Sequence, residues 1–154
     1  MTEIRCGKKV PPFTIATTGG TFRSRDVLGS KLVVYFYPRD NTPGCTRQGE
    51  ALRDLHARFR RAGTLVLGVS PDSLDAHGKL KAKTKFPFAL GCDSDRKLAG
   101  LFGVWKEKNM YGRKVMGIER STFPLDAAGM LRQEWRKVRV DGHAAAVLEA
   151  AQAL

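Results

Sequence analysis

The chain has 154 residues, of which 42% are hydrophobic and 27% charged, and its formal net charge at pH 7 is +12. This length and composition are ordinary for a soluble globular protein, so we expect one domain over residues 1–154 with a substantial core. No apolar run is long enough to span a bilayer, and residues 1–9 lack the apolar core of a signal peptide, which argues against a membrane protein and predicts a cytoplasmic one.

The N-terminal part of the chain predicts only short elements. Residues 12–17 predict a strand, and a Gly-Gly turn leads to a second short strand around residues 21–23. Residues 24–28 then suggest a single helical turn, which Gly29 closes.

A buried strand and a helix come next. Residues 32–37 are a continuous apolar and aromatic run with the length and β-branched content of a strand covered on both faces. Pro38 ends this strand, and residues 39–41 form a polar connection to the helix. Gly63 is placed to end the helix as a glycine of left-handed conformation.

The start of this helix carries a candidate nucleophile. Thr42 can act as N-cap, Pro43 suits the first helical position, and Gly44 leaves the backbone uncrowded. Cys45 follows in the first turn, beside unpaired backbone N–H groups and the positive end of the helix dipole. Both features favour the thiolate, which is the nucleophilic form. The alternative for Cys45 is a buried structural cysteine, but such a residue needs no helix start of this kind.

The middle of the chain continues the alternation of strands and helices. Residues 64–69 predict an apolar strand, and residues 70–72 begin another helix. Four residues share one face of that helix: Leu74, His77, Leu80 and Thr84. We interpret His77 as a packed or capping residue rather than a catalytic one.

The last part of the chain completes an α/β pattern. In order, the predicted segments are a short strand at 88–90, a brief helix at 95–102, a loop at 105–113, strands at 116–126 and 130–138 joined by a hairpin, and a final helix capped by Asp141. Strand–helix–strand units followed by a hairpin and a helix predict an α/β fold, with a mixed central β-sheet flanked by helices.

The net positive charge admits two interpretations, affinity for a nucleic acid or another polyanion, and a merely basic solvated surface. No aromatic platform is interleaved with the basic residues, and four lysines step around one helix instead of lining a single face: Lys79, Lys81, Lys83 and Lys85. We therefore expect no specific nucleic-acid partner, because a basic balance alone supports only non-specific affinity.

The cysteine content argues for reactive or incidental thiols. The chain has three cysteines, Cys6, Cys45 and Cys92, an odd and small number for a disulfide scaffold. No Cys/His spacing indicates zinc, so we expect no metal and no other cofactor.

Several segments resemble one protein family. The pattern Pro38-x-x-x-Thr42-x-x-Cys45 resembles the active-site signature of peroxiredoxins, and the run YFYPRDNTPGCTRQ is similar to their peroxiredoxin Q branch, also called bacterioferritin comigratory protein. Further blocks are similar to that branch in the same order: GKKVPPFTI, VLGVSPDS, FPFALGCDSDRKLAGLFGVW and KNMYGRKVMGIERSTFPLDAAGML. The resemblance implies a thioredoxin-like fold and a thiol-dependent peroxidase that reduces hydrogen peroxide and organic hydroperoxides.

The resemblance also implies roles for individual residues. Cys45 is the peroxidatic cysteine, whose thiolate becomes a sulfenic acid. The Thr42 hydroxyl and the N–H groups of Gly44 and Cys45 orient the peroxide, and Pro38 shields the sulfur from water. Arg120 stands in the place of the family's active-site arginine, where it would stabilise the thiolate and offer a fork of donors. Arg120 could instead be a surface residue of its predicted strand, and the match to the block ERSTF carries the assignment.

This sequence departs from the family at the second thiol. Many peroxiredoxin Q proteins have a resolving cysteine five residues after the nucleophile, where this chain has Glu50, and others carry it on the following helix, where residues 75–85 contain none. Cys6 and Cys92 remain. If the strand before Cys92 is parallel to the central one, Cys92 lies on the same sheet edge as Cys45 and could resolve the sulfenic acid after local unfolding. A one-cysteine cycle is simpler, with thioredoxin, a glutaredoxin or a small thiol as external reductant.

We therefore expect a monomeric, cytoplasmic thiol peroxidase. The alternative is a non-catalytic protein of the same fold that senses peroxide or holds unfolded clients, and the intact set of Pro38, Thr42, Cys45 and Arg120 argues against it. A dithiol disulfide reductase would need a Cys-x-x-Cys pair, and Gln48 occupies the second position of that pair.

Overall fold

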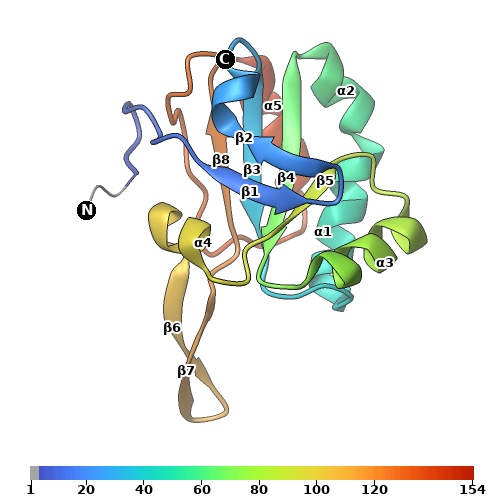
Figure 1. The fold of residues 1–154 in the computed structure, drawn as a ribbon, viewed down its shortest axis with the longest axis vertical. Helices are drawn as coiled ribbons and strands as arrows, with labels where there is room; N and C mark the ends of the chain where they lie inside the picture. Colours follow the sequence, from blue (N-terminus) through green and yellow to red (C-terminus); the bar gives the residue numbers. More distant parts are fainter. Residues whose placement is uncertain (1–3) are drawn as a thin grey trace.

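A computed structural model describes residues 4–154 as a six-stranded β-sheet with helices on both faces and a separate two-stranded hairpin (Figure 1). The sheet consists of β1 (Thr14–Thr17), β2 (Gly20–Arg23), β3 (Lys31–Phe36), β4 (Thr64–Ser70), β5 (Ala89–Cys92) and β8 (Ser121–Leu125). The hairpin consists of β6 (Trp105–Met110) and β7 (Arg113–Ile118). The helices are η1 (Ser24–Val27), α1 (Pro43–Asp54), α2 (His56–Arg61), α3 (Leu74–Thr84), α4 (Lys97–Phe102) and α5 (His143–Gln152).

The strand order of the sheet is β2-β1-β5-β4-β3-β8. Strands β3, β4 and β5 are parallel to one another, while β8 runs antiparallel to β3, and β1 runs antiparallel to both β5 and β2. The predicted mixed sheet flanked by helices is therefore confirmed. Because parallel strands end at the same edge of a sheet, the segments that follow β3, β4 and β5 meet at that edge.

Strand β3 is covered on both faces, as its apolar run predicts. Val34 and Phe36 belong to the cluster that includes Phe102 of α4, whereas Val33 and Tyr35 belong to the cluster on the other face, with residues of α1, α2, α3 and α5. A strand packed on both faces has little freedom to shift, so it forms a rigid base for the loop that follows it.

The helix predicted after β3 is interrupted once. It is divided into α1 and α2 at Leu55, whose N–H bonds to the oxygen of Leu52 in a tighter turn than that of an α-helix. Gly63 follows α2 with a φ of +66°, so the predicted left-handed glycine at the helix end is confirmed.

The loop predicted at residues 105–113 is wrong, because β6 and the start of β7 occupy this segment and form a projecting hairpin (Figure 1). Met110 pairs with Arg113 around the turn residues Tyr111 and Gly112, which both have positive φ. This is the geometry of a type I′ turn, which usually carries Asn-Gly, so Tyr-Gly gave a weak signal. The two strands are mostly exposed and lack the apolar alternation by which strands are recognised.

The predictions for the late strands are wrong in part. The strand predicted at residues 116–126 is divided into β7 and β8, and Arg120 lies in the connection between them. Residues 130–138 form no continuous strand and contact β8 through isolated bridges at Leu131 and Trp135.

Two predictions about helices also need correction. Asp141 does not cap α5, because the cap residue is Gly142 with a φ of +74°, and Asp141 instead lies 3.5 Å from Arg47 in an exposed ion pair. Of the four α3 residues predicted to share one face, His77, Leu80 and Thr84 are buried, whereas Leu74 is 41% exposed.

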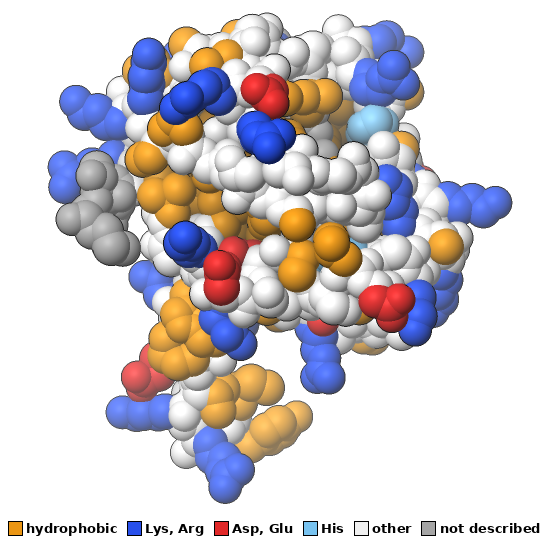
Figure 2. Space-filling view, in the orientation of Figure 1, with side chains coloured by type: hydrophobic (Ala, Val, Ile, Leu, Met, Phe, Trp, Pro, Cys, Tyr) orange, Lys and Arg blue, Asp and Glu red, His pale blue; other side chains and the backbone are white. Residues whose placement is uncertain are grey.

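On the face of the molecule shown in Figure 2, the basic residues are scattered. Figure 2 shows Lys and Arg side chains spread over the face in view, interspersed with polar and apolar groups. None of the helices within residues 4–154 has the length and apolar character that crossing a bilayer requires.

Candidate active site

The sheet edge at which the parallel strands end carries the helix start singled out in the sequence. Pro38 follows β3 in the chain, the loop turns at Asn41 with a φ of +60°, and α1 begins after Thr42. Thr42 has the extended backbone of an N-cap residue and Pro43 lies at the first helical positions, as predicted. Cys45 consequently lies in the first turn of α1, as a free thiol that is 6% exposed.

Arg120 reaches this cysteine from the connection between β7 and β8. Its Nη2 donates to Cys45 Sγ at 3.3 Å, and its Nη1 donates to Gln48 Oε1 at 2.6 Å. A guanidinium beside the sulfur stabilises a thiolate, and the free N–H groups of the first helical turn act in the same direction. Burial raises the pKa of the neighbouring Tyr35, and its proximity to Cys45 and Asp40 raises it further.

Gln48 is a member of the site that the sequence analysis missed. It lies three residues after Cys45, on the same side of α1, and is 2% exposed. Its Oε1 holds the Arg120 guanidinium, while its Nε2 is, among residues 4–154, the one buried side-chain nitrogen or oxygen without a hydrogen-bond partner. In the sequence, only the spacing of three residues from Cys45 indicates that Gln48 lies beside the cysteine. This spacing does not show that Gln48 binds Arg120, which is far along the chain.

Thr42 and Gly44 frame the cysteine on the chain. The Thr42 hydroxyl donates to the carbonyl oxygen of Arg39 at 2.9 Å and makes no capping bond to the helix, so Thr42 occupies the cap position without a side-chain cap. Its oxygen can still accept a hydrogen bond from another molecule. A Cβ at Gly44 would lie 3.4 Å from Arg120 Nη2, so the guanidinium packs closely against the helix start at this residue.

An open groove of about 410 Å³ is formed by Pro38, residues of the β6–β7 hairpin and neighbouring loops. Its lining combines apolar side chains with three cations, Arg39, Arg96 and Lys108, and one carboxylate, Asp72. The apolar residues include Trp105, Met110, Val115, Met116 and Ile118. Burial lowers the pKa of Lys108, and the charge of Arg120 lowers it further, whereas Glu119 and then Cys45 act in the opposite direction. The groove shares Pro38 and Arg39 with the loop that precedes Cys45, and it presents apolar surface and positive charge beside that loop.

The other two cysteines lie in different surroundings. Cys92 is the last residue of β5 and half-buried, and because β5 is parallel to β4 and hence to β3, the shared sheet edge considered in the sequence analysis is confirmed. Cys6 is exposed, with its Sγ 3.9 Å from Glu134 Oε2. Partial desolvation of the sulfur by its surroundings, followed by the Glu134 charge, raises the pKa of Cys6. The described part of the chain contains no group of three side chains that could hold a metal ion.

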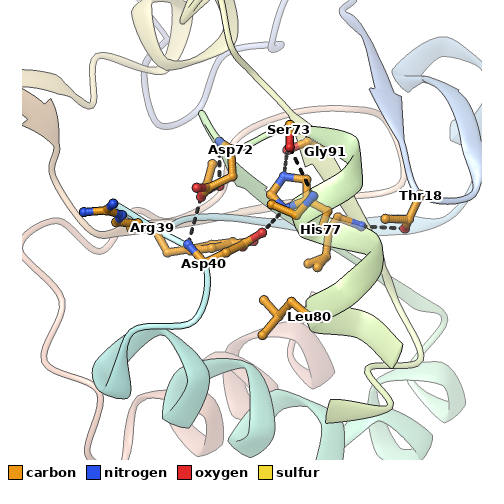
Figure 3. A network of polar contacts seen from close by, with 12 residues as sticks. Thr18, Arg39, Asp40, Asp72, Ser73, His77, Leu80 and Gly91 are labelled. Atoms are coloured by element: carbon orange, nitrogen blue, oxygen red, sulfur yellow. Dashed lines mark hydrogen bonds and ion pairs between the residues drawn. The ribbon is translucent and has the colours of Figure 1, made fainter. Parts of the chain in front are cut away.

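A buried polar network lies under the loop that precedes Cys45 (Figure 3). The Nδ1 atom of His77 is 2.6 Å from Asp40 Oδ2, and its Nε2 is 2.9 Å from the carbonyl oxygen of Gly91. The Tyr37 hydroxyl donates to Asp40 Oδ1 at 2.6 Å. His77 is fully buried, so its interpretation as a packed residue is confirmed, and Asp40 is a further residue that the sequence analysis did not single out.

Comparison with known proteins identifies close relatives over most of the chain. Residues 6–134 match the AhpC/TSA family. Peroxiredoxin Bcp of Bacillus subtilis (strain 168) is 46% identical over 147 residues, which make up 95% of this chain and 94% of the relative. Peroxiredoxin Bcp of Xanthomonas campestris pv. campestris is 50% identical over 140 residues, or 90% of this chain and 88% of the relative.

Solved structures show the same relationship in three dimensions. The bacterioferritin comigratory protein of Xanthomonas campestris, described for its alkyl peroxide reduction activity, superposes with a TM-score of 0.87 at 48% identity, covering 92% of this chain and 90% of that one. A crystal structure of a PrxQ mutant from Xylella fastidiosa has a TM-score of 0.92 at 37% identity and covers 99% of this chain and 98% of that one. The predicted thioredoxin-like fold is therefore confirmed.

Proposed function

The chain belongs to the AhpC/TSA family and is a thiol-dependent peroxidase of its peroxiredoxin Bcp branch, and we propose that Cys45 is the thiolate that attacks the peroxide. The observation that carries this proposal is the 3.3 Å contact between Arg120 Nη2 and Cys45 Sγ in the first turn of α1. A cation and free helix N–H groups together favour the nucleophilic form of the sulfur. Cys6 differs in both respects: it lies outside any helix start, and partial desolvation followed by the neighbouring Glu134 carboxylate raises the pKa of Cys6.

The reaction is a two-electron oxidation of the sulfur. The Cys45 thiolate attacks one oxygen of the peroxide O–O bond, so that an S–O bond forms while the O–O bond breaks. The sulfur becomes a sulfenic acid, and the departing oxygen takes up a proton and leaves as water or as an alcohol. Arg120 donates where negative charge moves from sulfur to oxygen, which is where a fixed cation lowers the barrier most.

The residues around Cys45 orient the peroxide. The Thr42 hydroxyl gives its own hydrogen to Arg39, so its oxygen is free to accept the hydrogen of a hydroperoxide. The N–H groups of Gly44 and Cys45, which have no partner within the helix, donate to the peroxide oxygens. Pro38 lines the groove and keeps bulk water from the sulfur.

The substrates are hydrogen peroxide and organic hydroperoxides. The small peroxide needs only the donors around Cys45, and the apolar side chains of the groove, such as Trp105 and Ile118, suit the organic part of a larger hydroperoxide. The Xanthomonas campestris relative is described for alkyl peroxide reduction, which supports this substrate class.

An external thiol regenerates the enzyme. Glu50 occupies the α1 position, five residues after Cys45, at which a resolving cysteine could attack the sulfenic acid. Cys92 lies at the end of a different element, β5. A first thiol therefore attacks the sulfenic acid, forming a mixed disulfide and water, and a second thiol displaces Cys45 and leaves as the disulfide product. Thioredoxin, a glutaredoxin or a small thiol supplies these electrons to a monomeric enzyme in the cytoplasm.

Replacement of single cysteines tests the proposal. In a steady-state assay of peroxide consumption with a thioredoxin system or a small dithiol, Cys45→Ser loses activity to the background rate, whereas Cys6→Ser keeps it. The reason is that only Cys45 combines the helix start with the Arg120 contact. Near-normal turnover by Cys45→Ser contradicts the proposal, and a wild-type protein that consumes no peroxide with any thiol favours the peroxide-sensing or client-binding alternative.

A further inference from the structure

The burial of Cys45 creates a requirement for regeneration. The residue is 6% exposed and is covered in part by Arg120. A peroxide is small enough to enter such a site, but a reducing thiol must approach the sulfur opposite the S–O bond that breaks, and a protein thiol brings far more bulk. The first turn of α1 and the loop before it must therefore open in each cycle, so whatever holds the loop closed controls regeneration.

Asp40 ties this loop, residues 38–42, to the body of the protein. Its Oδ1 accepts from the Tyr37 hydroxyl at 2.6 Å, and its Oδ2 lies 2.6 Å from His77 Nδ1. Its backbone N–H donates to Asp72 Oδ2 at 2.8 Å (Figure 3). The side chain of Asp40 is 5% exposed, so these partners replace water almost completely.

His77 extends the tie to two further elements. It projects from α3, and its Nε2 must carry a hydrogen because the Gly91 carbonyl oxygen, on β5, can only accept. A second hydrogen lies between His77 Nδ1 and Asp40 Oδ2, because two bare acceptors would repel each other at 2.6 Å. The pair is therefore neutral as a whole, and each of its ring nitrogens and carboxylate oxygens has a partner. Gly91 directly precedes Cys92, so the same network also fixes the strand end that carries the second thiol.

We propose that Asp40 and His77 are positioning residues of the peroxidase, which act as a latch that holds residues 38–42, and with them Cys45, in the closed arrangement that reacts with peroxide. The inference rests on the proposed role of Cys45. Opening of the loop separates the latch and leaves buried donors and acceptors unpaired, which keeps the open form rare. The latch thus sets how often the oxidised sulfur becomes accessible to a thiol.

Loosening the latch affects the two half-reactions unequally. When the closed form dominates, a tenfold larger open population raises the rate of thiol attack about tenfold and hardly lowers the closed fraction. A general loss of stability would not produce this split, because global unfolding exposes no folded active site to either reagent.

Four substitutions separate these effects. Asp40→Ala removes both carboxylate contacts, and Tyr37→Phe removes one of them without a change of shape. Asp40→Asn is the conservative variant, because its oxygen can accept from Tyr37 while its amide donates to the Nδ1 of a neutral His77. Thr84→Ala is the matched control, since it deletes a hydrogen bond to Leu80 at the far end of α3 and leaves the loop untouched.

The first measurement follows the thiol half-reaction in a background in which Cys6 and Cys92 are replaced by serine. One equivalent of hydrogen peroxide generates the sulfenic acid on Cys45, and excess thionitrobenzoate then reacts with it, forming a mixed disulfide and releasing water. We expect this step to be about tenfold faster in Asp40→Ala and a few-fold faster in Tyr37→Phe. Asp40→Asn returns the rate most of the way to that of the parent protein, Thr84→Ala leaves it unchanged, and the peroxide step of Asp40→Ala slows by a smaller factor.

The second measurement needs no peroxide. Amide hydrogen exchange of the reduced protein is expected to accelerate across residues 39–46 in Asp40→Ala, with β3 as protected as before. If Asp40→Ala does not fold, Tyr37→Phe decides by the same two measurements. If the folded variants react with the thiol and exchange their amide hydrogens at the rates of the parent protein, the latch is overturned. If the parent protein forms no sulfenic acid, the role of Cys45 is overturned, and the hydrogen-exchange result alone then decides on the latch.

Discussion

At the scale of single residues, the chemistry depends on how Arg120 is held at the sulfur. An arginine side chain has several rotatable bonds, so its guanidinium stays beside Cys45 only where a further contact fixes it. Gln48 provides that contact through the 2.6 Å bond from Arg120 Nη1 to its Oε1. Because glutamine is uncharged, it orients the guanidinium without neutralising it, and the full positive charge remains available to the thiolate.

Replacement of Arg120 and Gln48 should show that they act as one unit. We expect Arg120→Ala to slow oxidation of Cys45 by hydrogen peroxide by a factor on the order of a hundred, a typical loss for one electrostatic contact in a transition state. Gln48→Leu should slow it by about tenfold, and the double variant should be no slower than Arg120→Ala, because both changes remove the same contact. Stopped-flow oxidation kinetics measure these rates.

A matched control for this series is Arg47→Ala. Arg47 is an exposed cation on α1, the helix that carries Cys45, and its ion-pair partner is the exposed Asp141. Its removal therefore tests how far the loss of one positive charge, without the contact to the sulfur, changes the oxidation rate. An oxidation rate that Arg120→Ala leaves unchanged, or that Arg47→Ala lowers as much, contradicts the role given to Arg120.

The residues of the site divide into those with a local signal and those without one. Thr42, Pro43 and Cys45 could be placed at a helix start because the caps and the first turn depend on neighbours in the chain. The contact of Arg120 with Gln48 joins residues 72 positions apart, and no local pattern specifies which pairs the fold will bring together. The role of Gln48 therefore has no local signal, and only the match to the family block ERSTF predicts a place for Arg120 in the site.

At the scale of elements, apolar patterns predict what is buried and fail where an element stands in solvent. Strand β3 was predicted because burial on both faces demands a continuous apolar run. The β6–β7 hairpin was mistaken for a loop because its strands are mostly exposed and its stability depends on a type I′ turn with Tyr111 and Gly112. The hairpin contributes to the groove near Cys45, so the same error hid part of the site.

The contact between α5 and β8 predicts a dependence of stability on pH. His143, the first residue of α5, lies with its Nε2 2.8 Å from Thr122 Oγ1 on β8. Burial, and secondly the charge of Arg120, lower the pKa of His143 to about 4. An unfolded histidine has a pKa of about 6.5, so between these two values the unfolded chain binds a proton that the folded protein does not. The free energy of unfolding therefore falls as the pH is lowered through this window.

Urea unfolding at several pH values checks this dependence. Between the two pKa values, each pH unit below the unfolded value lowers the free energy of unfolding by about 1.4 kcal/mol. Between pH 7 and pH 5 the loss of stability attributable to His143 is therefore at most about 2 kcal/mol. We expect His143→Gln, which cannot take up a proton, to flatten the dependence in that range. A variant with the same slope as the wild-type protein would assign the effect to other groups.

At the scale of the whole molecule, the mixed sheet gathers the site from distant parts of the chain. The alternation of strands and helices was sufficient to predict an α/β protein, but not the order in which the strands pair. In that order, β3, β4 and β5 end at one edge, which brings together the loop before Cys45, the α3 residue His77 and the strand end at Cys92. The latch can form because three strands of the sheet are parallel.

The same arrangement decides how the oxidised enzyme is expected to be regenerated. Cys45 follows β3 and Cys92 ends β5, and β4 lies between these two strands in the sheet. A disulfide requires the two Cα atoms to approach within about 7 Å, so the first turn of α1 would have to unwind while the bonds from His77 to Asp40 and Gly91 break. An external thiol needs only the opening of the loop. The route through an external thiol therefore disrupts less of the structure.

We accordingly expect one equivalent of hydrogen peroxide to leave mainly a sulfenic acid on Cys45 rather than an internal disulfide. With dimedone present, intact mass and peptide mapping should find the adduct on the Cys45 peptide as the main product, with the same yield in Cys92→Ser as in the wild-type protein. The equal yield matters because a competing internal disulfide would divert sulfenic acid from dimedone only in the protein that keeps Cys92. A dominant peptide joining Cys45 to Cys92 or to Cys6, formed faster than dimedone traps Cys45, would overturn the one-cysteine route and make the opened loop an intermediate of an intramolecular cycle.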